Sequence, residues 1–165
     1  MRILGIDPGI GRLGWAIIEH DKGKQQPVAY DCLETEKTLS PEKRLELIYN
    51  HLQELCKNYH PDVLAIEDLF FNKNVTTAFS VGQARGVVLL VASQYNMPVT
   101  IYSPSQIKIA VTGYGKAEKH QVAHMVKLIL KLEKMPKLDD TVDALAIALT
   151  HAFTLKPLQH SKHSV

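Results

Sequence analysis

The chain has 165 residues, of which 45% are hydrophobic and 22% charged, and its formal net charge is +2. This length allows one domain whose core buries about two-thirds of the unfolded surface. Two cysteines are too few for a disulfide scaffold, and no apolar run approaches the roughly 18 residues that span a bilayer. A predicted strand begins at Ile3 and leaves no room for a signal peptide, so we expect a soluble cytoplasmic protein. We assign one domain to residues 1–155 and expect a disordered tail over 156–165.

The first part of the chain predicts three strands joined by short turns. The run from Ile3 to Asp7 is apolar until its last residue, and the following Pro8-Gly9 pair ends a strand. Residues 13–19 and 27–35 predict two more strands, with the polar segment 20–26 as the turn between them. These three segments predict an antiparallel meander with Asp7 at a strand tip.

A helix and a buried strand are predicted next. Ser40-Pro41-Glu42 combines a capping hydroxyl, a proline at the first helical position and an early acid, all typical of a helix start. The strand over 63–67 is apolar on both faces and ends at Glu67. A helical crossover favours a parallel strand beside the first. Because neighbouring strands lie about 4.8 Å apart, Asp7 and Glu67 could share an ion.

The second half predicts a helix over 74–95, a strand over 99–102 and three further helices. These helices are expected over 104–111, over 117–132 and from a cap at Asp139 or Asp140 to about residue 154. Asp140 and Asp143 are three residues apart on the last helix, so they share one face.

Four acids, Asp7, Glu67, Asp140 and Asp143, are thus predicted at one edge of one sheet. Taken singly, Asp7 can be a turn former, Asp140 a cap and Asp143 a first-turn acid favoured by the helix dipole. Together they repel: two unit charges 4 Å apart interact by about 4 kcal/mol at an effective dielectric near 20. Such a cluster holds protons or binds cations, and hard carboxylate oxygens favour Mg²⁺ or Mn²⁺ over zinc.

The helix over 74–95 has a second half, 87–92, that is apolar nearly all round, so it must bury more than one face. Gly82 and Gly86 lie one turn apart and allow another helix to approach closely. This pattern fits either a self-complementary dimer contact or packing within one chain.

Four blocks, residues 3–9, 65–67, 82–87 and 140–148, together resemble the RuvC family of Holliday junction resolvases. The resemblance runs from about residue 3 to residue 151 in the family's order and spacing. It implies a ribonuclease H-like α/β fold with a five-stranded mixed sheet of order 3-2-1-4-5 and helices on both faces. It also implies a crossover junction endodeoxyribonuclease that resolves four-way DNA junctions by symmetric paired nicks in bacterial recombination and repair.

The resemblance places the family's catalytic acids on the four already singled out, Asp7, Glu67, Asp140 and Asp143. It implies two Mg²⁺ ions per subunit, replaceable by Mn²⁺, a homodimer, and the branch-migration proteins RuvA and RuvB as partners. It matches Phe70, with Phe71 beside it, to a ring that stacks on DNA bases, and Lys108 and Lys119 to cations near the scissile phosphate.

A basic surface is expected around this acidic centre, because several cations belong to segments that adjoin it. They are Lys73, Arg85, Lys108, Lys116 and Lys119.

Three alternatives use parts of the same pattern. A ribonuclease H-like nuclease acting on RNA or a hybrid would use the same acids, and a non-catalytic module would bind junctions without cutting them. An actin-like phosphotransferase also places an aspartate near a glycine turn, but this chain is too short for the two halves that enclose a nucleotide.

Overall fold

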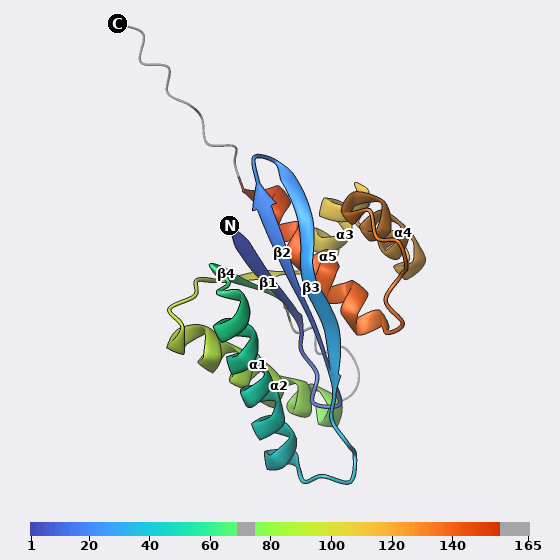
Figure 1. The fold of residues 1–165 in the computed structure, drawn as a ribbon. Helices are drawn as coiled ribbons and strands as arrows, with labels where there is room; N and C mark the ends of the chain where they lie inside the picture. Colours follow the sequence, from blue (N-terminus) through green and yellow to red (C-terminus); the bar gives the residue numbers. More distant parts are fainter. Residues whose placement is uncertain (69–74, 156–165) are drawn as a thin grey trace, which may run out of the picture.

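A five-stranded mixed sheet organises the computed structural model, which describes residues 1–68 and 75–155 (Figure 1). Its strands are β1 (Arg2–Asp7), β2 (Arg12–Asp21), β3 (Lys24–Glu34), β4 (Val63–Glu67) and β5 (Val99–Tyr102). Their order is β3-β2-β1-β4-β5, with β1, β2 and β3 antiparallel and with β4 parallel to both β1 and β5. The predicted meander, the parallel pair and the strand order are confirmed.

Helices cover both faces of the sheet, as predicted (Figure 1). Side chains alternate along β1: Leu4 and Ile6 belong to the core on the side of the first two helices, whereas Ile3 belongs to the opposite core. Within the described ranges, none of the helices is both long and apolar enough to cross a membrane. The helices are α1 (Pro41–Tyr59) and α2 (Val75–Gln94) on one face, and α3 (Pro104–Thr112), α4 (Lys119–Leu130) and α5 (Asp139–Thr154) on the other.

The turn between β2 and β3 is shorter than the predicted segment 20–26. The ladder continues to the pair Asp21 and Lys24, and the turn consists of Lys22 and Gly23. Both turn residues have positive φ, 47° and 80°, and two-residue turns of this kind match the twist of the strands that they join. The prediction was wrong because the polar residues there belong to a solvent-exposed hairpin arm that still forms ladder hydrogen bonds.

Two predicted helix caps also differ from the structure. The N-cap of α5 is Leu138, without a side-chain capping bond, so Asp139 and Asp140 lie inside the first turn, where the helix dipole favours negative charge. Ser40 is the N-cap residue of α1, but its hydroxyl donates to the Glu42 carboxylate instead of accepting a backbone N–H. The sequence pattern thus predicted where both helices start, but not the hydrogen bonds that their first polar side chains make.

Candidate active site

The carboxyl ends of the two central parallel strands bring two acids to one edge of the sheet. Ile6 of β1 pairs with Ile66 of β4, and the next residue on each strand is an acid, Asp7 and Glu67 respectively. The structure thus places these carboxylates on adjacent strands at the same level of the sheet.

Two glycines allow the helix that carries the other two acids to lie directly on the sheet. A Cβ atom on Gly5 would lie 2.3 Å from the backbone oxygen of Ala144, and one on Gly14 would lie 1.9 Å from the backbone oxygen of Asp140. Neither distance is possible for a real side chain, so only glycine permits this approach. Gly14 pairs with Asp7 across β1 and β2, and the first turn of α5 therefore packs beside Asp7.

The positions of the four acids at the ends of β1 and β4 and at the start of α5 place their charges close enough to act on one another. Burial is the main cause that raises the pKa of Asp7 from 3.8 to about 7, and the neighbouring charges of Asp143, Glu67 and Asp140 raise it further. The charge of Lys119 lowers the pKa of Asp7. Burial, followed by Asp143, also raises the pKa of Glu67. The site therefore favours either a bound proton or a bound cation.

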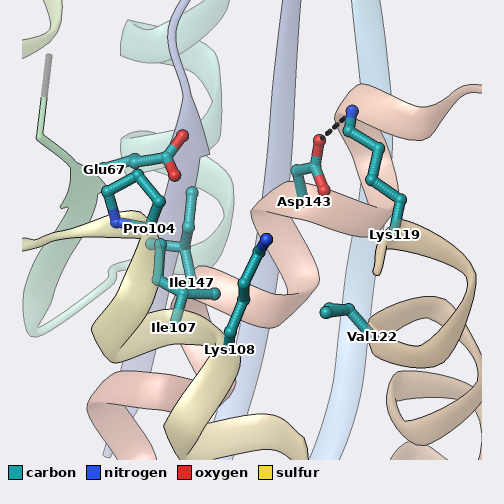
Figure 2. A pocket seen from close by; sticks show the side chains of 8 residues that line it. All are labelled: Glu67, Pro104, Ile107, Lys108, Lys119, Val122, Asp143 and Ile147. Atoms are coloured by element: carbon teal, nitrogen blue, oxygen red, sulfur yellow. Dashed lines mark hydrogen bonds and ion pairs between the residues drawn. The ribbon is translucent and has the colours of Figure 1, made fainter. Parts of the chain in front are cut away.

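Two of the three acids on α5, Asp140 and Asp143, each contact a cation of the protein. Lys119 Nζ lies 3.3 Å from Asp143 Oδ2 (Figure 2), and this carboxylate raises the pKa of Lys119. Arg12 Nη1, at the start of β2, lies 3.7 Å from Asp140 Oδ2. Arg12 was not among the predicted site residues, although its position five residues after Asp7, at the start of the strand that pairs with β1, was a usable signal.

An open cavity of about 230 Å³ adjoins this acidic edge. Figure 2 shows Glu67 and Asp143 at its rim, with Lys108 of α3 and Lys119 of α4 reaching toward the same space. Apolar side chains of Pro104, Ile107, Val122 and Ile147 complete the lining. Lys108 lies close enough to lower the pKa of Glu67, against the effect of burial. The cavity thus offers both acid oxygens and cationic groups to a ligand.

The remaining predicted DNA-contacting residues fall in different places. Arg85 on α2 is half-buried and donates from Nη1 to the backbone oxygen of Glu67, so it fastens the end of β4. Lys116 is exposed in the loop between α3 and α4. Phe70, Phe71 and Lys73 lie outside the described residues.

The four carboxylates fit a hard divalent cation in their chemistry, because oxygen ligands are those that Mg²⁺ and Mn²⁺ prefer. Among residues 1–68 and 75–155, however, no three histidine, cysteine, aspartate or glutamate side chains converge closely enough to hold an ion. Mutual repulsion and the contacts with Arg12 and Lys119 explain the spread, since each α5 acid turns toward its own cation.

The sheet order, with acids at the carboxyl ends of the two central parallel strands, is that of the ribonuclease H-like fold. The family model described as "Crossover junction endodeoxyribonuclease RuvC" matches residues 3–151. The chain belongs to this family. Crossover junction endodeoxyribonuclease RuvC of Brevibacillus brevis is 52% identical over 152 residues, which cover 92% of each chain. The protein of the same name from Fusobacterium nucleatum is 50% identical over 94% of this chain and 82% of its own length.

Solved structures agree with this assignment. RuvC of Thermus thermophilus superposes with a TM-score of 0.86 at 38% identity, covering 93% of this chain and 94% of that protein. The same protein in complex with a Holliday junction substrate gives a TM-score of 0.88 at 37% identity, covering 93% of each chain. The yeast mitochondrial Holliday junction resolvase Ydc2 shares the fold, with a TM-score of 0.65 at 16% identity over 92% of this chain and 78% of that protein.

Proposed function

We propose that this chain is a structure-selective endonuclease that resolves four-way DNA junctions in recombination and repair by symmetric paired nicks. The observation that carries the proposal is the placement of Asp7 and Glu67 at the ends of adjacent strands, with the start of α5, which bears Asp140 and Asp143, packed beside Asp7 and next to a cavity with two lysines. Relatives at about half identity bear the name of this activity, and a structural relative was solved with a Holliday junction substrate.

The four acids are the proposed ligands of two divalent ions, with Mg²⁺ as the expected species and Mn²⁺ as a substitute. Asp7 is more buried than Glu67 and Asp143, and the charges of all three other acids act on it, so it suits the position between both ions. Glu67 would hold one ion, and Asp140 with Asp143 the other. When bound, such ions activate a water and stabilise the departing oxygen of a phosphodiester.

The lysines of the cavity have roles toward the phosphate in this proposal. Lys119 stabilises negative charge that develops on the phosphate or helps to position the attacking water, and Lys108, on α3 at the same cavity, contacts the same DNA backbone. Lys116 and Lys73 extend the basic surface, while Arg85 supports the end of β4. Stacking of Phe70 or Phe71 on DNA bases stays a prediction from the sequence.

A symmetric dimer fits this function, because a four-way junction has near two-fold symmetry and needs one nick in each of two equivalent strands. An exposed apolar face of α2 supports a dimer. Phe79 and Leu90 are 69% and 52% exposed, and a Cβ atom on Gly82 or Gly86 would meet no atom within 4 Å. These four positions recur at helical spacing and form one apolar stripe, so packing within the described part of the chain does not explain the glycines. RuvA and RuvB as partners and a cytoplasmic location stay predictions.

The experiment that tests the proposal compares wild type with Asp7→Asn on a synthetic four-way junction. We expect cleavage by wild type in Mg²⁺ and none by the variant, with junction affinity in Ca²⁺ changed by less than about tenfold, or about 1.4 kcal/mol. Asp21→Asn is the matched control, because Asp21 also ends a strand but at the opposite edge of the sheet.

Each other outcome contradicts a part of the proposal. Undiminished cleavage by Asp7→Asn would remove Asp7 from the chemistry. Binding by wild type without cleavage in Mg²⁺ or Mn²⁺ would indicate a non-catalytic junction-binding module. Cleavage of RNA or of a hybrid with intact junctions would indicate a different nuclease of the same fold.

A further inference from the structure

Arg12 occupies a position at the acidic edge that the predicted DNA-contacting cations do not include. In the order β3-β2-β1-β4, it belongs to β2 and Glu67 to β4, so the two flank Asp7 along the edge. Arg12 begins β2 two residues before Gly14, the partner of Asp7. Its side chain therefore starts just beyond the end of β1, where a DNA backbone bound at the acids would pass.

The guanidinium of Arg12 is held loosely by two acids. Nε lies 3.4 Å from Glu34 Oε2 and Nη1 lies 3.7 Å from Asp140 Oδ2. Both separations exceed the roughly 2.7–2.9 Å of a charge-assisted hydrogen bond. The side chain is 52% exposed, and neither contact involves Nη2. The cation is thus retained at the edge with donors still free to take another oxygen.

Arg2 at the opposite edge shows what a structural arginine looks like in this fold. It makes a comparably long ion pair, 3.9 Å from Nε to Glu19 Oε1, but its Nη1 also donates to the backbone oxygen of Tyr59 at 2.6 Å. That bond joins β1 to the end of α1. Within the described ranges, the side chain of Arg12 makes two long ion pairs, one with the exposed Glu34 and one with the partly buried Asp140, and loose pairs near the surface contribute little to stability.

We propose that Arg12 binds a backbone phosphate of the junction beside the metal site, an assignment that rests on the proposed function. The planar guanidinium offers paired N–H groups that match two phosphate oxygens. Glu34 and Asp140 hold this cation over the edge of the sheet until DNA supplies a phosphate. Arg12 thereby extends the basic surface to the β2 side of Asp7.

The test is the salt dependence of junction binding by Arg12→Gln, measured in Ca²⁺ with the full chain. Each phosphate contact contributes about 0.9 to the slope of log affinity against log salt, so we expect the slope to fall by about 1. Affinity at physiological salt should drop several-fold. Arg12→Lys, which keeps the charge, should restore most of the slope.

Lys24→Gln is the matched control, because it removes one exposed cation from the far end of the same hairpin, and its slope should equal that of wild type. An Arg12→Gln slope equal to that of wild type would overturn the assignment even if the wild type cleaves junctions normally. A wild type that does not bind or cleave junctions would instead overturn the proposed function. Unchanged melting temperatures of the variants establish that loss of folding does not cause the effect.

Discussion

Asp7 shows how a single residue couples stability to function. The folded chain keeps this carboxylate buried among three other acids, and its pKa rises from 3.8 to about 7. The folded state therefore binds the proton more tightly than the unfolded state. In the proposed metal site, a bound divalent cation would relieve the same repulsion, so the ion-free chain would be less stable than the ion-bound chain.

We predict that ion-free wild type loses stability as the pH rises between 3.8 and about 7, because the folded chain must release a proton that it holds more tightly than the unfolded chain does. One pH unit between the two pKa values corresponds to about 1.4 kcal/mol, so Asp7→Asn should gain a few kcal/mol over wild type near neutrality. Urea unfolding in EDTA at about pH 5 and about pH 8 measures this difference. Equal pH dependence of the two proteins would contradict it.

We also predict that Mg²⁺ raises the melting temperature of wild type, since a ligand that binds the folded state stabilises it in proportion to the logarithm of its concentration. Asp7→Asn should respond much less. A thermal melt at a series of Mg²⁺ concentrations checks this. An equal rise in both proteins would place the ion elsewhere.

The sequence could predict the acids, because each ends a strand or begins a helix and these ends meet at one edge. It could not show that Asp140 and Asp143 turn toward Arg12 and Lys119. Those contacts depend on the packing of α5 against β2 and of α4 beside it, which no local pattern encodes.

At the scale of elements, α5 and its contact with the sheet decide the geometry of the site. We predict that Gly14→Ala displaces the start of α5, since the new Cβ would lie 1.9 Å from the backbone of Asp140. Overpacking of this kind costs about 1–3 kcal/mol, and a displacement of 1 Å near reacting groups can reduce the rate about 10²-fold. Junction cleavage and urea unfolding measure both effects.

Gly11→Ala is the matched control for that variant. Gly11 lies in the turn before β2, and its added Cβ would meet the flexible end of Arg44 at 3.2 Å instead of a backbone atom. We expect near wild-type cleavage from it. Full activity of Gly14→Ala would mean that the position of α5 does not determine the chemistry.

The elements themselves were largely predictable, because hydrophobic periodicity and the Ser-Pro-Glu start mark their positions. The turn at Lys22-Gly23 and the cap of α5 were not. In both cases the polar residues fit more than one local structure. Pairing with β3 set the length of the turn, and packing of α5 set the first residue of the helix.

At the scale of the whole molecule, the apolar stripe on α2 sets the expected assembly. We predict that Leu90→Glu converts a dimer into a monomer, because it places an unpaired charge within the apolar stripe, at its C-terminal end. Leu128→Glu, at a leucine of α4 that is 57% exposed, should leave the dimer intact. Sedimentation at micromolar concentration and the ratio of paired to single nicks on a cruciform plasmid measure the effect.

A Leu90→Glu protein that stays dimeric would exclude this face as the interface.

The strand order was predictable because a helical crossover and two short turns leave few arrangements of five strands. The sequence could not predict what packs against the apolar stripe, because the same small residues suit contacts within a chain or between chains.

The central claim is that Asp7, Glu67, Asp140 and Asp143 hold divalent ions beside the scissile phosphate. Anomalous diffraction from crystals grown with Mn²⁺ measures it most directly. Two peaks at the carboxyl ends of β1 and β4, with Asp7 between them, are the predicted result. Peaks bound elsewhere, or none at this edge at saturating Mn²⁺, would contradict the claim.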